Sequence, residues 1–185
     1  MEHANVPFFD IITFGIQNGF RHFFRRMPCE LADYRILCRS LDSLAIDVVK
    51  QRNLQEIVKE LKTGDNDYDP EERRTIVGWK GRARNAAFTL LYLFLVGESE
   101  WHARDRTVAY NAVQYVVSHG RKFKYRTRKM VREAFEERFI ITPKQRLGLD
   151  KWPITEPQEE GWQDAEGTTE EETPGFDFDW DSDWS

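Results

Sequence analysis

Hydrophobic residues in the first 150 positions recur mostly at steps of three and four, which is the spacing of one face of an α-helix. Alternation of apolar and polar residues is almost nowhere long enough to predict a strand. The clearest helix begins after Glu30, and its continuous apolar face consists of Leu31, Tyr34, Leu37, Leu41, Leu44 and Val48. The pattern therefore predicts an all-α fold.

Glycine, proline and capping residues divide this pattern into about six or seven helices. The first helix follows Pro7, and we expect it to bend or break at Gly15 or Gly19. Asn53 and Glu56 form a capping pair for the helix at 54–61. Asp69, followed by a proline and two glutamates, predicts another helix start. Further helices are predicted at 83–96, 105–120 and 127–139, with a short turn at 142–143.

The predicted helix at 83–96 is the most apolar, and Gly97 ends it. Because it is apolar nearly all round, we expect it at the centre of a helical bundle. Its longest apolar run, 86–96, is well short of the ~20 residues that a membrane-spanning helix needs. Asp10 interrupts the apolar stretch near the N-terminus, so we expect no secretory signal.

The charge divides the chain into two unlike parts. The whole chain has 27 Lys and Arg against 32 Asp and Glu, a net charge of −5. Residues 151–185 hold twelve of the acids and one base, which leaves residues 1–150 with 26 bases and 20 acids. Helical periodicity also vanishes from Trp152 onward. We predict a helical domain at 1–150 and a disordered acidic tail at 151–185, with too few apolar residues to offset the entropy of ordering.

No pattern in the chain indicates catalysis. The four histidines are scattered without the spacing of metal ligands, and the two cysteines, nine residues apart, form neither a metal knuckle nor a disulfide framework. Residues 78–82 lack the spacing of a phosphate-binding loop, and no nucleophile elbow is present. We therefore expect a reduced intracellular protein that is not an enzyme and takes no cofactor, metal or small-molecule substrate.

Two charged segments suggest alternative functions. Residues 121–132 contain seven Lys and Arg and no acid, with Phe123 and Tyr125 between them, which is the composition of a nucleic-acid or anionic-membrane patch. A solvated loop and helix start is the simpler interpretation, because acids follow directly. Residues 174–185 alternate Asp with Phe and Trp, as disordered partner-binding segments do. A nucleic-acid-binding protein and an acidic-tail adaptor are therefore the rival functions.

The step into the central helix indicates a groove for an amphipathic helix. Gly81 allows a close approach to the helix start, and Arg82 adds a carboxylate-binding group to the positive helix end. With the apolar face after Glu30, this predicts a site for apolar anchors at i, i+3 or i+4, and i+7, plus one acid. A plain bundle core with a surface arginine is the alternative. The predicted lining is Leu37, Leu41, Leu44, Trp79, Gly81, Arg82 and Phe88.

The Trp-x-Gly-Arg step at 79–82, before an Ala/Phe/Leu-rich helix, resembles the signature of Bcl-2-like apoptosis regulators. Lys80 interrupts their usual Trp-Gly-Arg, and no Asn precedes Trp79. The chain is similar in particular to the adenoviral early-region 19-kilodalton (small T antigen) family of viral Bcl-2-like inhibitors. That similarity covers about 19–135. It is carried by the aromatic and basic cluster at 19–26, the Glu-Leu-Ala-Asp at 30–33, the Trp after the apolar helix at 101, and the acidic, proline-containing C-terminus.

The resemblance implies a Bcl-2-like helical bundle that binds and silences the host's pro-apoptotic Bax and Bak. In that family the Gly-Arg lies in the groove and the Arg meets the acid of the bound death-promoting helix, which assigns these roles to Gly81 and Arg82. It also implies an early, oncogene-type viral protein inside the host cell. There it would be cytoplasmic and associated with host membranes and the nuclear envelope, with nuclear-lamina or endomembrane proteins as further partners. Nucleic acid is not an expected partner.

Overall fold

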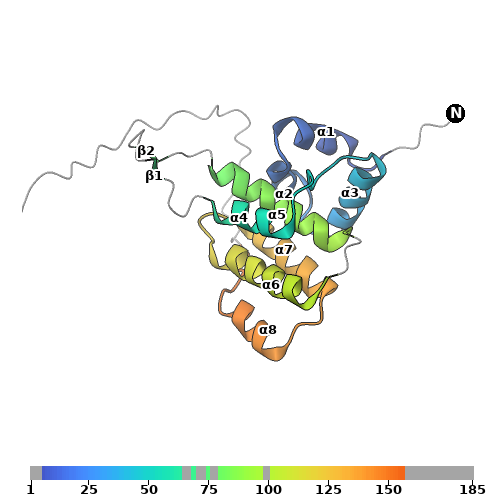
Figure 1. The fold of residues 1–185 in the computed structure, drawn as a ribbon. Helices are drawn as coiled ribbons and strands as arrows, with labels where there is room; N and C mark the ends of the chain where they lie inside the picture. Colours follow the sequence, from blue (N-terminus) through green and yellow to red (C-terminus); the bar gives the residue numbers. More distant parts are fainter. Residues whose placement is uncertain (1–5, 64–67, 70–73, 76–78, 98–100, 157–185) are drawn as a thin grey trace, which may run out of the picture.

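The computed structural model describes residues 6–63, 68–69, 74–75, 79–97 and 101–156, and within them the fold is helical (Figure 1). The predicted all-α class is confirmed, while the acidic tail lies outside the described residues from 157 onward. The elements are α1 (Phe9–Asn18), the 3-10 helix η1 (Phe20–His22), α2 (Phe23–Arg26), α3 (Leu31–Ser43), α4 (Leu54–Lys62), β1 (Tyr68–Asp69), β2 (Arg74–Thr75), α5 (Trp79–Leu95), α6 (Ala103–Ser118), α7 (Tyr125–Arg138) and α8 (Pro143–Asp150).

The N-terminal segment breaks at Gly19, as the sequence predicted. Gly19 has φ 106°, a backbone conformation that residues with a side chain rarely adopt, and it separates α1 from η1. The break lets the backbone N–H of Arg21 donate to the Asn85 side-chain oxygen of α5, at 2.8 Å. This hydrogen bond joins η1 to the first turns of α5.

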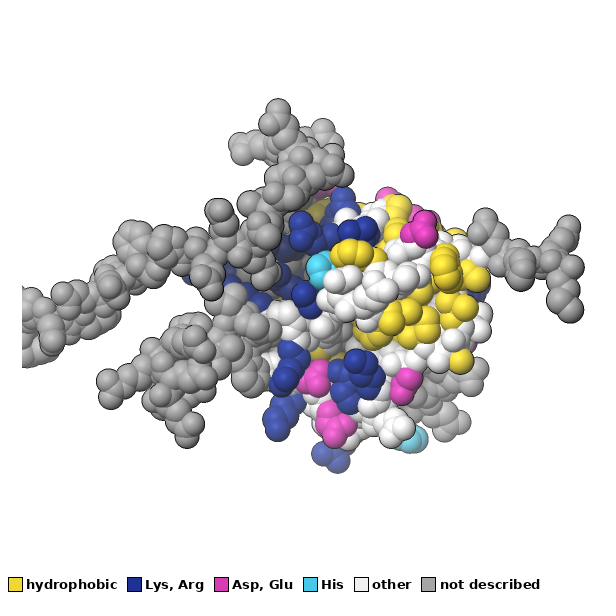
Figure 2. Space-filling model, turned by 90° about the horizontal axis from the view of Figure 1, so that it is seen from above, with side chains coloured by type: hydrophobic (Ala, Val, Ile, Leu, Met, Phe, Trp, Pro, Cys, Tyr) yellow, Lys and Arg dark blue, Asp and Glu magenta, His cyan; other side chains and the backbone are white. Residues whose placement is uncertain are grey.

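The outer surface of α1 is partly apolar. Phe9 and Ile16, seven residues apart and therefore on the same side of the helix, are 55% and 51% exposed. Figure 2, which looks at the molecule from above, shows hydrophobic side chains gathered on one part of this face and Lys and Arg on another. Apolar and basic side chains are therefore segregated on this side of the bundle.

Gly15 lies within α1 because the Phe23 ring packs directly against it. A Cβ atom at Gly15 would lie 2.2 Å from Phe23 Cε1, and Phe23 is fully buried. We expect Gly15→Ala to lower the free energy of unfolding by about 1–3 kcal/mol, although alanine favours helices. Gly81→Ala is the matched control, because its Cβ would lie 3.5 Å from the nearest atom, in Arg21. Urea denaturation measures both, and a Gly15→Ala variant as stable as the control would contradict this packing.

α3 is shorter than the sequence predicted, so the expectation that Val48 continues its face was wrong. The helix ends at Ser43, and Ala45 adopts a left-handed conformation with φ 53°. The N–H of Ala45 donates to the Asp42 carbonyl and the N–H of Ile46 to the Leu41 carbonyl, which is the Schellman pattern of a helix C-terminus. Val48 is buried, but it reaches the core from the following loop.

The helix predicted from Asp69 is wrong at the positions that the structure describes. Tyr68 and Asp69 pair in antiparallel register with Thr75 and Arg74, whereas 70–73 and 76–78 lie outside the described residues. An Asp-Pro step is typical of a turn as well as of a helix start, and here Asp69 is the last residue of β1.

The predicted cap of α4 is confirmed. The Glu56 N–H donates to the Asn53 side chain at 2.9 Å, and the Asn53 N–H donates to the Glu56 carboxylate at 2.8 Å. A second such box, between Thr142 and Gln145, begins α8, so the predicted short turn is an eight-residue helix. α6 and α7 each begin two residues before their predicted starts.

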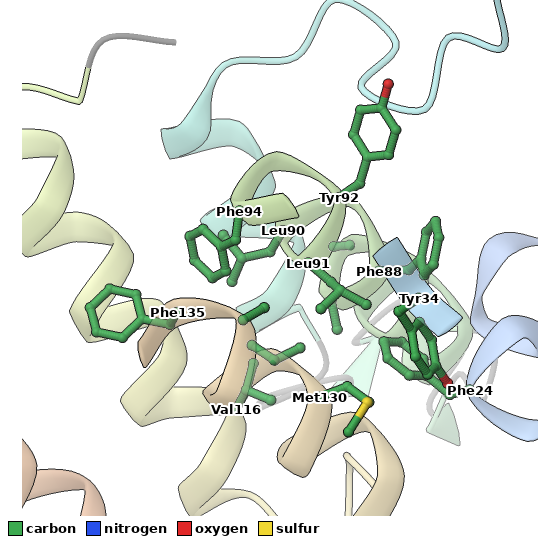
Figure 3. Close-up of a cluster of buried hydrophobic side chains, with 14 of the residues drawn as sticks. Phe24, Tyr34, Phe88, Leu90, Leu91, Tyr92, Phe94, Val116, Met130 and Phe135 are labelled. Atoms are coloured by element: carbon green, nitrogen blue, oxygen red, sulfur yellow. The ribbon is translucent and has the colours of Figure 1, made fainter. Parts of the chain in front are cut away.

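α5 lies at the centre of the bundle, as its all-round apolarity predicted, and η1, α3, α4 and α7 pack against it (Figure 1). Figure 3 shows Phe94 of α5 beside Phe135 of α7, and Phe88 near Phe24; the ring centroids are 5.6 and 5.9 Å apart. Fully burying side chains of this size contributes roughly 1.5–3 kcal/mol each. Among the described residues, no helix combines the length and the apolarity needed to cross a membrane.

Candidate helix-binding site

Three of the predicted groove residues belong to the interior of the bundle. Leu37 and Leu41 of α3 and Phe88 of α5 are all 0% exposed. The Phe88 ring lies 4.7 Å from the Phe23 ring and 5.8 Å from the Phe20 ring, measured between centroids. In this structure these side chains are part of the core and are not accessible to a ligand.

The other predicted residues lie at the surface. Arg82 is exposed in the first turn of α5, and Gly81 beside it is half-buried against the Arg21 side chain. Leu44 caps the end of α3 and is 39% exposed. Trp79 begins α5, while its side chain lies outside the described residues. The structure therefore brings Gly81 and Arg82 together at the start of α5 and places Leu44 elsewhere.

The end of α3 lies beside the second half of α5, far along that helix from Arg82. The Tyr92 hydroxyl donates to the Asp42 carboxylate at 3.3 Å, which fixes the end of α3 beside the second half of α5. Burial, followed by the Asp42 charge, raises the pKa of Tyr92 to about 12, so this hydroxyl stays a donor at neutral pH. Arg82 and Tyr92 are ten residues apart, about 15 Å along a helix axis. An amphipathic helix of about three turns spans the same length.

α4 runs alongside α5 and has an open depression on its outer side. The depression has a volume of about 500 Å³ and is lined by Gln55, Val58, Lys59, Lys62 and Thr63. Its lining combines a half-buried valine with two lysines, so it suits an apolar side chain flanked by acids.

Arg52 holds α4 and the preceding loop on α5, a role that no sequence pattern indicated. Its guanidinium donates to the carbonyls of Val48 and Val49, at 3.2 and 2.8 Å, and to the Thr89 hydroxyl of α5 at 3.1 Å. It also pairs with Glu60 of α4. These contacts join residues up to 37 positions apart, which no local pattern could indicate.

The basic stretch at 121–132 is a loop followed by the start of α7, as the simpler interpretation had it, but much of it is built into the fold and is not solvated. Phe123 is fully buried and Lys122 is 7% exposed, with its ammonium group 3.1 Å from the Tyr115 hydroxyl. Three further cations donate to backbone carbonyls: Arg126 to those of Arg25 and Met27, Arg128 to that of Val117, and Lys129 to that of Cys29. Replacing Arg126, Arg128 and Lys129 together would therefore disturb the fold as well as any nucleic-acid affinity.

Neither cysteine has the environment of a reactive thiol. Burial is the largest influence on both, and it raises the pKa of the Cys38 thiol strongly and that of the Cys29 thiol as well. A thiol with a raised pKa stays protonated at neutral pH and is a poor nucleophile. Within the described parts of the chain, no group of three or more His, Cys, Asp or Glu is placed to hold a metal ion.

The environment of His22 predicts that the fold loses stability on acidification. Burial first, and then the charges of Arg21, Arg25 and Arg26, lower the pKa of His22 below its usual 6.5. Below pH 6.5 the unfolded chain therefore binds more protons at His22 than the folded chain does. The stability that neutral His22 contributes is fully present above pH 6.5 and is lost as the pH falls toward the lowered pKa of the folded state. We expect His22→Gln to reduce the loss of unfolding free energy between about pH 7 and 5. Urea denaturation at each pH tests this, and identical slopes for both proteins would contradict it.

Comparison of the chain with protein-family models, with curated proteins and with solved structures gave no match.

Proposed function

We propose that the protein is a Bcl-2-like inhibitor of apoptosis that captures the amphipathic death-promoting helix of host Bax and Bak. The observation that carries the proposal is the exposed Arg82 on the first turn of the buried central helix. A central apolar helix enclosed by amphipathic ones supports the finer assignment to a Bcl-2-like bundle. The motifs at 19–26, 30–33 and 79–82 support a likeness to the adenoviral early-region 19-kilodalton family. That likeness in turn supports a location inside the host cell.

The ligand would lie along α5 between Arg82 and the end of α3. Its acid pairs with Arg82, and its apolar anchors contact Leu44 and the half-buried Val58 of α4. Leu37 and Leu41 join this surface only when α3 moves away from α5. A bound helix favours that movement if it contacts the opened form better than the closed one.

A peptide titration tests the proposed function. Fluorescent peptides with the death-promoting helix sequences of Bax and Bak are titrated with the full chain, beside the same peptides with the acid replaced by alanine. We expect saturable binding of the parent peptides and weaker binding of the alanine peptides. A full chain that binds none of the peptides would contradict the proposal.

The acidic-tail adaptor is the rival that this titration does not address. Its segment, 174–185, lies outside the described residues, whereas Ile154 is half-buried against the core. Deleting 157–185 therefore removes the adaptor segment and leaves that contact in place. Helix capture predicts that death-blocking activity in cells survives the deletion, and the adaptor predicts that it is lost.

A further inference from the structure

Three arginine side chains come together where η1 and α2 meet α5, and we call them the arginine cluster: Arg21, Arg25 and Arg84. The Arg21 guanidinium lies against Gly81, and the Arg84 guanidinium donates through Nε to the Lys122 carbonyl at 2.8 Å. Burial first, and then the charges of Arg21 and Arg25, lower the pKa of Arg84. Arg21 and Arg25 therefore lie close enough to Arg84 for their charges to act on it.

Among the described residues, no acid forms an ion pair with Arg21, Arg25 or Arg84. The ion pairs found there all involve other bases, namely Arg35, Arg52, Lys129 and Arg132. Lys and Arg side chains also gather on one part of the face seen in Figure 2. Like charges held together disfavour the folded state, and an anion bound among them relieves that repulsion. Guanidinium groups bind carboxylates through paired hydrogen bonds and stack on aromatic rings.

The described chain ends near the start of α7. Ile154 packs against the core. Burial raises the pKa of Tyr125, and the Glu156 charge raises it further against the opposing effect of Lys129, so Glu156 lies near the start of α7. The next residue, Arg126, donates to the carbonyl of Arg25 at 3.2 Å. Arg126 thus connects the start of α7, near which the described chain ends, to α2, which carries Arg25.

We propose that the arginine cluster is a binding site for an acidic, aromatic peptide segment, and that its occupant is this chain's own residues 176–184. In that segment Asp177, Asp179, Asp181 and Asp183 alternate with phenylalanine, tryptophan and serine, which offers carboxylates and rings to the same guanidinium groups. Residues 157–185 as a whole hold eleven acids and no Lys or Arg. The inference does not depend on the proposed capture of a death-promoting helix.

The linker is long enough for this contact. About 20 residues separate Glu156 from the segment, and an extended chain spans at most ~3.3–3.6 Å per residue, about 70 Å. A flexible tether of this length holds the segment at an effective concentration of the order of millimolar. Even weak individual ion pairs are then sufficient for substantial occupancy.

Paramagnetic relaxation in the full chain tests the contact. A nitroxide is attached to a cysteine introduced by Ser185→Cys, with Cys29→Ser removing the half-buried thiol and with Cys38 protected by burial. We expect the backbone amide signals of Gly19 and Gly81 to lose most of their intensity at about 0.05 M salt. At about 0.5 M salt we expect them to recover, because screening shortens the range of the attraction.

Two pairs of substitutions control the assignment. Arg21→Gln with Arg25→Gln is expected to restore the Gly19 and Gly81 signals at low salt. Arg39→Gln with Arg146→Gln removes the same charge from exposed positions elsewhere and is expected to leave the signals broadened. Unbroadened Gly19 and Gly81 signals at low salt would overturn the proposal, as would stronger broadening at Gly120, beside the 121–132 stretch. Equal recovery in both variants would overturn it too.

Discussion

Phe88→Ala is expected to lower the free energy of unfolding by about 3–5 kcal/mol. Phe88 is 0% exposed, and its ring contacts those of Phe20, Phe23 and Phe24 at centroid distances of 5.8, 4.7 and 5.9 Å. Truncation removes these contacts and leaves a cavity between α5 and the N-terminal segment. The surrounding backbone is held by the bond from Arg21 to Asn85, so the cavity cannot close easily.

The matched control for Phe88→Ala is Leu44→Ala. Both residues were predicted to line the groove, but Leu44 is 39% exposed, and we expect its truncation to cost less than about 1 kcal/mol. Urea denaturation of the two variants measures the difference. If Phe88 instead lined an open groove, its truncation would weaken peptide binding and leave stability close to that of the Leu44 variant.

Local signals predicted much of the fold. The all-round apolarity of 83–96 correctly predicted α5 at the centre, and the Asn53–Glu56 pair correctly predicted the start of α4. Both features are determined by residues that are neighbours in the sequence. The end of α3 was missed because Ala45 occupies the left-handed position where glycine is usual. The pairing of 68–69 with 74–75 was missed because Asp-Pro fits both a turn and a helix start.

The candidate site was predictable only in part. The spacing of Leu37 and Leu41 correctly put both on one apolar face, but periodicity does not tell whether such a face meets the core or a partner. From the sequence, the aromatic and basic cluster at 19–26 indicated only a resemblance to a family. Its structural role, a hydrogen bond from Arg21 to Asn85 across 64 positions, depends on the tertiary fold.

Arg82→Ala is expected to leave the fold intact and to weaken capture of the Bak helix sharply. Arg82 is exposed, so its loss removes no core packing, whereas a bound helix would cover it together with the acid. Losing one partner of a covered, hydrogen-bonded charge pair typically costs about 2–5 kcal/mol of binding, which is about 30-fold to several thousand-fold in Kd. Arg39→Ala, another exposed arginine, is the control and is expected to bind as wild type does.

The most direct test of helix capture is a double-mutant cycle between Arg82 and the acid of the Bak helix. Kd is measured for wild type and Arg82→Ala, each against the parent peptide and the peptide with alanine at the acid, with circular dichroism confirming that the variant is folded. We predict a coupling energy of at least about 1.5 kcal/mol, so that the second change costs at least about tenfold less once the first has been made. A coupling energy near zero in a folded Arg82→Ala variant would contradict the proposed pairing.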